Sequence, residues 1–200
     1  MSDRRLLVSP GDLDDAAVES ILRTAHRWAN RGAVAIAERS RVVGLLFLSS
    51  SLRTRAGFTA AAIRLGHQVV DVADSRWDPR MSAAESFDDT LRTLSGFVDA
   101  VCVRAPVELD AFARSDLAVG RIVNAGDRWH HPTQALIDLF AMERFVGPVE
   151  TLDIALIGDM TMRASRSLLS LLARRPPASL SLSAPESRRA HGIDLGQVLA

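Results

Sequence analysis

The sequence predicts an α/β protein built on a doubly wound parallel sheet. Short apolar runs alternate along the chain with segments whose apolar residues recur at helical spacing, and this order is typical of a parallel sheet with right-handed crossovers. Polar segments follow several of the apolar runs, at the strand ends where open parallel sheets bind ligands. An apolar content of 48% in 200 residues is enough for a sizeable core.

The expected elements can be given in chain order. Pro10-Gly11-Asp12 marks the start of an amphipathic helix that ends near Gly32, because apolar residues recur at helical spacing between them. Strands are expected at the apolar runs 42–48, 67–73, 99–103, 121–124, 152–157 and 180–183. Another helix is expected to begin at a Ser-x-x-Glu capping box at 82–85 and to end at about 95. The other helices are expected at 56–65, 107–114, 133–145, 164–173 and 185–200.

Glycine and proline punctuate these elements. Gly66 is a candidate C-cap of the helix before it, and Gly147-Pro148 breaks the chain between two α/β segments. We therefore expect a first domain at 1–147, which includes the linking helix, and the start of a second domain at 148–200. This second part carries only about two strands, which rarely form a stable layer, so we expect the chain to be truncated.

Composition narrows the class of protein. Lys+Arg and Asp+Glu both number 24, so the net charge is zero, and neither a nucleic-acid partner nor a membrane surface is expected. We find no apolar run of membrane-spanning length and no signal peptide. The single cysteine, Cys102, lies in an apolar run and is expected to be a buried thiol of a cytoplasmic protein.

The segment Ser49 to Arg55 follows the first apolar strand and opens a helix. The first N–H groups of a helix lack partners and favour an anion. Arg53 and Arg55 add guanidinium groups, and Ser51 and Thr54 add hydroxyl donors. The segment therefore predicts a phosphate or carboxylate site. The structural alternative is an ordinary serine N-cap followed by solvated arginines.

Two more polar segments end strands of the same predicted sheet. Arg104 closes the strand at 99–103, and the loop 124–134 places His131 and Gln134 beside the next helix. Because the carboxyl ends of parallel strands share an edge, we expect these side chains to lie near Ser51. The alternatives are a surface charge at Arg104 and independent polar loops, and we favour a structural role for the lone His67.

Other kinds of site find no support in the sequence. No strand is followed by Gly-x-Gly-x-x-Gly or by a Walker-type loop, and no histidine or cysteine cluster has metal-ligand spacing. We therefore expect neither a cofactor nor a metal ion.

Taken together, these segments resemble the aspartate/ornithine carbamoyltransferase family. The family motif Ser-Thr-Arg-Thr-Arg corresponds to Ser51-Leu52-Arg53-Thr54-Arg55, and its Val-x-Arg strand end to the run that closes with Arg104. Asn-Ala-Gly-Asp and His-Pro-Thr-Gln-Ala-Leu-x-Asp occur at 124–127 and 131–138, and a Gly-Asp turn with later Arg and Ser occurs at 158–167. Asn-Ala-Gly-Asp and the Gly-Asp turn resemble the aspartate branch, whereas Ser-Leu-Arg-Thr-Arg and the loop residue Trp77 resemble the acylornithine branch.

The resemblance implies transfer of a carbamoyl group from carbamoyl phosphate to the amino group of an amino acid, with aspartate favoured, as in pyrimidine biosynthesis. It implies that Ser51, Arg53, Thr54 and Arg104 hold the phosphate, that Thr54, Arg104 and His131 polarise the carbonyl oxygen, and that Gln134 holds the carbamoyl amide. Arg163 would meet a carboxylate of the acceptor. It also implies a homotrimer with shared sites and no cofactor.

The sequence departs from the family pattern at two points. Leu52 replaces a threonine, and the loop before Glu85 lacks the expected lysine, although Arg80 lies nearby. These departures leave two alternatives open: a weak or inactive homologue that has a binding or assembly role, and an enzyme for ornithine or an N-acylornithine.

Overall fold

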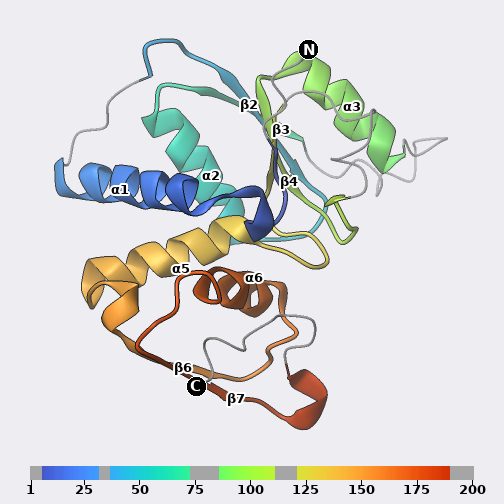
Figure 1. Cartoon of the computed structure of the whole chain (residues 1–200). Coiled ribbons are helices and arrows are strands. Elements are labelled where there is room, and N and C mark those ends of the chain that lie inside the picture. Colours follow the sequence, from blue (N-terminus) through green and yellow to red (C-terminus); the bar gives the residue numbers. More distant parts are fainter. Residues whose placement is uncertain (1–5, 32–36, 73–85, 111–120, 190–200) are drawn as a thin grey trace. The chain divides into compact units, whose positions relative to one another are not determined.

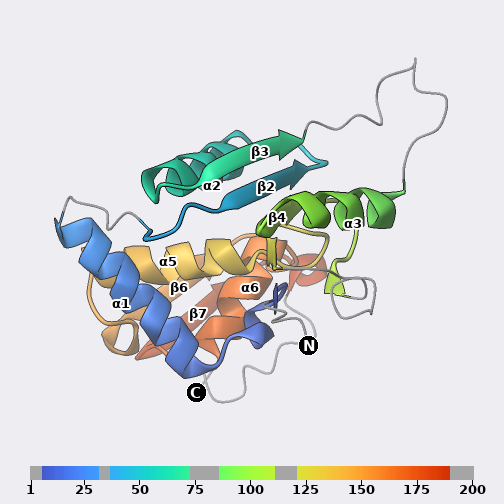
Figure 2. The same ribbon diagram turned by 90° about the horizontal axis from the view of Figure 1, so that it is seen from above.

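The computed structural model describes residues 6–31, 37–72, 86–110 and 121–189, which group by contacts into two compact units. The first unit comprises Met1–Val8 and Ala33–Arg128, and the second comprises Ser9–Gly32 and Trp129–Ala200. Figures 1 and 2 show the elements of each unit from two directions. The division expected at residue 147 follows the chain rather than these contacts and stays a prediction.

The first unit is built on a parallel sheet with the strand order β1-β5-β4-β2-β3. The sheet is formed by β1 (Leu6–Leu7), β2 (Val42–Phe47), β3 (Gln68–Val72), β4 (Ala100–Arg104) and β5 (Ile122–Asn124). The one crossover of this sheet that the structure describes in full, from β2 to β3, runs through a helix, as the alternating sequence predicts.

Helices cover both faces of this sheet. The helix α2 (Leu52–Arg64) lies on one face and α3 (Phe87–Phe97) on the other (Figure 1). Successive residues of β2 alternate between two buried clusters: Leu46 packs with Leu91 and Leu94 of α3, whereas Leu45 packs with Cys102 and, on α2, Phe58. Both faces are therefore apolar, which explains the uninterrupted apolar run in β2.

In its described residues, the second unit contains three α-helices and a two-stranded parallel sheet. These elements are α1 (Asp15–Arg31), α5 (Pro132–Phe145), α6 (Arg163–Leu172), β6 (Asp153–Ile157) and β7 (Ser179–Ser183). The helix α5 packs against α1 and against α6, and Figure 1 shows α6 between α5 and the β6–β7 pair. Short 3₁₀ helices lie at Pro10–Asp12, Val149–Thr151 and Glu186–Arg188.

Several boundary predictions are confirmed and others are wrong. Gly66 follows α2 with φ 80°, as a C-cap glycine does. The turn at Pro10–Asp12 and the helix that ends near Gly32 are confirmed, but α1 begins only at Asp15, because Leu13 is extended after the 3₁₀ turn. Of the helix expected over 185–200, the structure describes a 3₁₀ turn at Glu186–Arg188, and residues 190–200 lie outside the described residues.

Other predictions concern residues at the edge of the described ranges. The helix expected at 107–114 does not include residues 107–109, and its remainder after Asp110 lies outside the described residues. The capping box predicted at 82–85 also lies outside them, and α3 is capped instead by Ser86, which accepts a hydrogen bond from the N–H of Asp89. The strand β1 was not predicted, because two residues are too short to show a period.

Candidate active site

The start of α2 carries the first group of predicted site residues. Ser51 is the N-cap residue, but its side chain caps no backbone N–H. Its hydroxyl instead donates to Oγ1 of Thr54 at 2.9 Å. Arg53 is exposed and makes no ion pair with any described residue. The N-terminus of this thirteen-residue helix therefore keeps its electrostatic preference for an anion, with a hydroxyl pair and a guanidinium beside it.

Arg55 forms an ion pair within the first unit. Its Nε and Nη2 atoms donate to the two carboxylate oxygens of Asp71 on β3, at 2.7 and 2.6 Å. The hydrogen bond to this carboxylate is the main reason that the pKa of Arg55 is raised. These two hydrogen bonds tie α2 to the sheet and pair the charge of Arg55 with a carboxylate. That Arg55 adds charge to an anion site stays a prediction.

Arg104 lies at the same edge of the sheet as the segment that leads into α2. It is the register partner of Phe47, and its carbonyl oxygen accepts a hydrogen bond from the N–H of Leu48 at 2.8 Å. Its Nη1 atom donates to the carbonyl oxygen of Ala125 at 3.0 Å. A cavity of about 460 Å³ opens beside this edge and is lined by Phe47, Leu48, Ser49, Ser50, Ser51, Leu52 and Arg55.

Leu52 is the departure from the family motif at this site. Its side chain is 85% exposed at the first position of α2. A leucine there supplies no hydrogen bond, and its exposed surface contributes nothing to the core. The residue is therefore explained by neither packing nor capping within the part of the unit that the structure describes.

Buried polar residues shape the loop after β5. Asn124 is fully buried, donates to the carbonyl oxygen of Val8 at 2.8 Å and accepts from the N–H of Gly126 at 2.8 Å. Asp127 is also fully buried, and its carboxylate accepts from the N–H of Leu109 at 3.2 Å. The Asn-Ala-Gly-Asp motif thus fixes the backbone of this loop.

His131 is the N-cap residue of α5 in the second unit and is 7% exposed. Its Nδ1 atom accepts from the backbone N–H of Gln134 at 3.3 Å. A backbone N–H can only donate, so a neutral His131 carries its proton on Nε2. Oγ1 of Thr133 lies 3.3 Å from the same Nδ1 atom. His131 is therefore prepared to donate a hydrogen bond from Nε2.

Gln134 is oriented by a neighbour one turn later in the helix. Its Nε2 atom donates to Oδ1 of Asp138 at 2.8 Å. Burial raises the pKa of Asp138, and the hydrogen bond from Gln134 opposes that effect. With its amide nitrogen held, the carbonyl oxygen Oε1 is the end of Gln134 that remains to accept a hydrogen bond.

Two residues of α6 hold the segment around His131. Ser167 is fully buried, and its Oγ accepts from the backbone N–H of His131 at 2.9 Å. The guanidinium of Arg166 lies over the ring of Trp129, with Cζ 5.4 Å from the ring centroid. Both residues lie in the 158–167 motif, which by itself assigns them no role. The positioning role of Ser167 was missed, because its partner lies 36 residues away.

Arg163 is the first residue of α6 and is half-buried. The turn before it is held by Asp159, whose carboxylate accepts from the N–H and the hydroxyl of Thr161 at 2.8 and 2.6 Å. These two bonds are the main reason that the pKa of Asp159 is lowered. Arg163 thus adds its charge to a helix N-terminus, the end of a helix that favours anions.

The predicted residues fall into two groups. Ser51, Arg53, Thr54 and Arg104 belong to the first unit, whereas His131, Gln134 and Arg163 belong to the second. Within each group the structure describes the contacts given above. The convergence of both groups on one ligand stays a prediction, as do the roles of Trp77 and Arg80, which lie outside the described residues.

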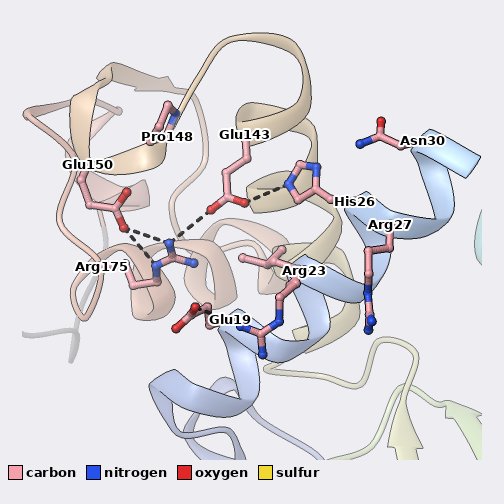
Figure 3. A pocket seen from close by; sticks show the side chains of 10 residues that line it. Glu19, Arg23, His26, Arg27, Asn30, Glu143, Pro148, Glu150 and Arg175 are labelled. Atoms are coloured by element: carbon pink, nitrogen blue, oxygen red, sulfur yellow. Dashed lines mark hydrogen bonds and ion pairs between the residues drawn. The ribbon is translucent and has the colours of Figure 1, made fainter.

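A second cavity, of about 590 Å³, lies within the second unit (Figure 3). None of the predicted site residues lines it. In its wall, Arg175 donates to Glu150 at 2.9 Å and to Glu143 at 3.2 Å, and Glu143 also lies 3.0 Å from Nε2 of His26. These groups pair with one another. The wall of this cavity therefore links α1, α5 and the segment that follows α6.

The described residues hold no group of three or more His, Cys, Asp or Glu side chains that could bind a metal ion. No helix in the described part of the chain is long and apolar enough to cross a membrane. Cys102 is a free, buried thiol, and burial raises its pKa to about 12.

The fold defines a class of protein: parallel α/β proteins, in which ligands bind at the carboxyl ends of the strands. Residues 5–144 match the family model described as "Aspartate/ornithine carbamoyltransferase, carbamoyl-P binding domain". The chain belongs to the aspartate/ornithine carbamoyltransferase family.

Relatives and solved structures agree with this assignment. The chain is 36% identical over 180 residues to an aspartate carbamoyltransferase catalytic subunit of Bifidobacterium adolescentis, a match that covers 87% of this chain and 56% of that protein. Aspartate transcarbamoylase from Trypanosoma cruzi in complex with aspartate and phosphate matches with a TM-score of 0.83 and 30% identity, covering 96% of this chain and 63% of that one. Ornithine carbamoyltransferase from Gloeobacter violaceus matches with a TM-score of 0.78 and 31% identity, covering 96% and 62%. The chain thus spans about three fifths of the length of these proteins.

Proposed function

We propose that the protein transfers a carbamoyl group from carbamoyl phosphate to the amino group of an amino acid, and that aspartate is the acceptor. Membership of the family supports the reaction, and the names of the similar proteins support the acceptor. The observation that carries the proposal is the start of α2. There, an N-terminus uncapped by its serine side chain lies beside an exposed Arg53 that makes no ion pair with any described residue.

In this proposal the phosphate binds at that helix start. The Ser51 and Thr54 hydroxyls and the Arg53 and Arg104 guanidiniums donate to its oxygens, and the helix dipole adds a favourable field. Arginine suits the task because its planar fork matches two phosphate oxygens at once. In the structure Ser51 donates its one hydroxyl proton to Thr54, so this proton turns from Thr54 to a phosphate oxygen when the ligand binds.

The chemistry needs positioning and charge stabilisation rather than a covalent intermediate. The amino nitrogen attacks the carbonyl carbon, and a C–N bond forms while the C–O bond to phosphate breaks. Negative charge that develops on the carbonyl oxygen is stabilised by Thr54, Arg104 and the Nε2–H of His131. Gln134 accepts a hydrogen bond from the carbamoyl amide, and Arg163 pairs with a carboxylate of the acceptor. The attacking amine passes one proton to the departing phosphate, which leaves as hydrogen phosphate.

The acceptor has one specific alternative. Leu52 is exposed at the first position of α2, where a hydroxyl residue stands in the family motif. The same substitution is a feature of the acylornithine branch, so an ornithine or N-acylornithine acceptor is the second candidate. A weak or inactive homologue is an alternative to the activity itself, because Leu52 removes one hydrogen-bond donor from the phosphate site.

We further infer a homotrimer with shared active sites, in which Arg80 of a neighbouring subunit supplies the charge of the absent loop lysine. Closed symmetry is the norm for soluble oligomers. A cytoplasmic location accompanies the proposal, because a lone buried thiol such as Cys102 suits a reducing compartment.

An acceptor panel tests the proposal. The purified protein is incubated with carbamoyl phosphate and, in turn, with aspartate, ornithine and N-acetylornithine, and the ureido product is measured by a colorimetric assay. Product with aspartate supports the proposal. If product forms only with ornithine or N-acetylornithine, that compound replaces aspartate as the proposed acceptor. If the folded protein gives no product with any of the three compounds, the proposed reaction is overturned.

A further inference from the structure

We propose that Asp138 determines the specificity of this site for the carbamoyl group by fixing which end of the Gln134 amide faces the substrate. The inference rests on the proposed function, in which Gln134 meets the carbamoyl amide. It assigns a new role to Asp138, a side chain that takes part in no step of the reaction. Gln134 and Asp138 both lie in one helix, α5.

The geometry of α5 holds Gln134 at two points. Its backbone N–H is bonded to Nδ1 of His131, and its side-chain Nε2 donates to Oδ1 of Asp138 at 2.8 Å. The two side chains lie four residues apart, which places them on the same face of a helix. Both are half-buried, so water competes only weakly for the bond between them.

An ionised carboxylate removes the ambiguity of an amide side chain. A glutamine amide can turn by half a revolution and exchange its donor end for its acceptor end with little change of shape. A carboxylate has acceptors only, so Asp138 bonds Nε2 and leaves Oε1 at the opposite end. Gln134 therefore offers the substrate an acceptor rather than a donor.

This orientation distinguishes acyl phosphates of the same shape. A carbamoyl group presents an –NH₂ donor, whereas an acetyl group presents a methyl group in the same place. The Oε1 acceptor forms a hydrogen bond with the carbamoyl –NH₂, but an acetyl methyl group leaves it without a partner. A site built around a hydrogen bond rejects an analogue that cannot form that bond. If the Gln134 amide turned, its –NH₂ would face the –NH₂ of the substrate and the preference would be lost.

The test compares stable analogues by calorimetry on the whole chain. Phosphonoacetamide carries the amide, 2-oxopropylphosphonate carries a methyl group in its place, and inorganic phosphate carries neither. We expect the wild-type protein to prefer phosphonoacetamide over 2-oxopropylphosphonate by about tenfold, which corresponds to about 1.4 kcal/mol. In Asp138→Asn, which keeps the size and a hydrogen-bond partner but allows both orientations of Gln134, we expect a preference below about threefold and an unchanged affinity for phosphate.

A purely structural role for Asp138 would not change this ratio, because asparagine preserves the packing and one hydrogen bond. A wild-type preference retained in a folded Asp138→Asn protein therefore overturns the inference. The variant Gln134→Leu separates this outcome from failure of the proposed function. If Gln134→Leu retains the preference, or if the wild-type protein binds none of the three probes, then the role proposed for Gln134 itself is wrong and the inference falls with it.

A measurement on the wild-type protein does not depend on how the variants fold. NMR coupling across the hydrogen bond between the Gln134 side-chain nitrogen and the Asp138 carboxyl carbon is recorded with and without phosphonoacetamide. We expect the coupling to persist in the complex. Its loss on binding would show that Asp138 does not hold the amide in the bound state, and this result would contradict the inference.

Discussion

Replacing Arg53 by alanine separates ligand binding from stability in α2. Arg53 is exposed and makes no ion pair with any described residue, so its loss should change the free energy of unfolding by no more than about 0.5 kcal/mol. In the complex, its guanidinium would donate to a charged phosphate. Loss of such a partner costs roughly 2–4 kcal/mol of binding, which raises the dissociation constant for phosphate about 30- to 1000-fold.

Arg55→Ala is a matched control, because it removes the same side chain from the same helix two positions later. Arg55 is bound by Asp71 in a two-point ion pair, but both side chains are 39% exposed. Its loss should therefore destabilise the fold by only about 0.2–1 kcal/mol. Arg55 borders the cavity at the start of α2, but its charge is already paired with Asp71. We therefore expect the phosphate affinity to change less than threefold, or about 0.6 kcal/mol.

Calorimetric titration of phosphate, together with urea unfolding of both variants, measures the two quantities. The expected pattern is weakened binding with wild-type stability for Arg53→Ala, and reduced stability with nearly wild-type binding for Arg55→Ala. The reverse pattern would refute the argument. Unchanged phosphate affinity in a folded Arg53→Ala protein would alone remove Arg53 from the site.

Three further predictions concern stability. Ser167→Ala leaves the buried N–H of His131 without its acceptor and should cost about 1–3 kcal/mol in urea unfolding; an unchanged midpoint would contradict this role. The pKa of Glu150 is lowered, first by a backbone hydrogen bond and then, after the opposing effect of burial, by Arg175. Its stabilising contribution is therefore present above the unfolded pKa of 4.5 and is lost as the pH falls through the folded pKa, so Glu150→Gln should flatten the acid limb of a stability–pH curve. Gly57→Ala adds a Cβ where nothing lies within 4 Å and should stabilise α2 by about 0.5–1 kcal/mol; a lower urea midpoint would show that this glycine is required.

The sequence predicts most of the first unit because its signals are local. The apolar run before Ser49 can be buried only as a central strand, and β2 is such a strand. The φ of 80° at Gly66 follows from the freedom that glycine alone has at a helix end. Both inferences need only neighbouring residues. The strand β1, by contrast, is two residues long and shows no period.

The direction in which a side chain points could not be predicted in the same way. Arg53 and Arg55 are equivalent in the sequence pattern, and only the pairing of β3 beside β2 brings Asp71 to Arg55. Similarly, nothing near His131 in the sequence shows that Ser167 will accept its N–H bond. Partners that are distant in sequence are set by the fold, so a motif identifies candidate residues but does not assign their partners.

The most direct test of the account is to follow the new bond itself. The protein is incubated with ¹³C-labelled carbamoyl phosphate and ¹⁵N-labelled aspartate, and the reaction is followed by NMR. The account predicts a one-bond coupling between the labelled carbon and nitrogen that grows together with inorganic phosphate, at a rate proportional to protein concentration. Release of phosphate without this coupling, or no enzyme-dependent change in either signal, would contradict it.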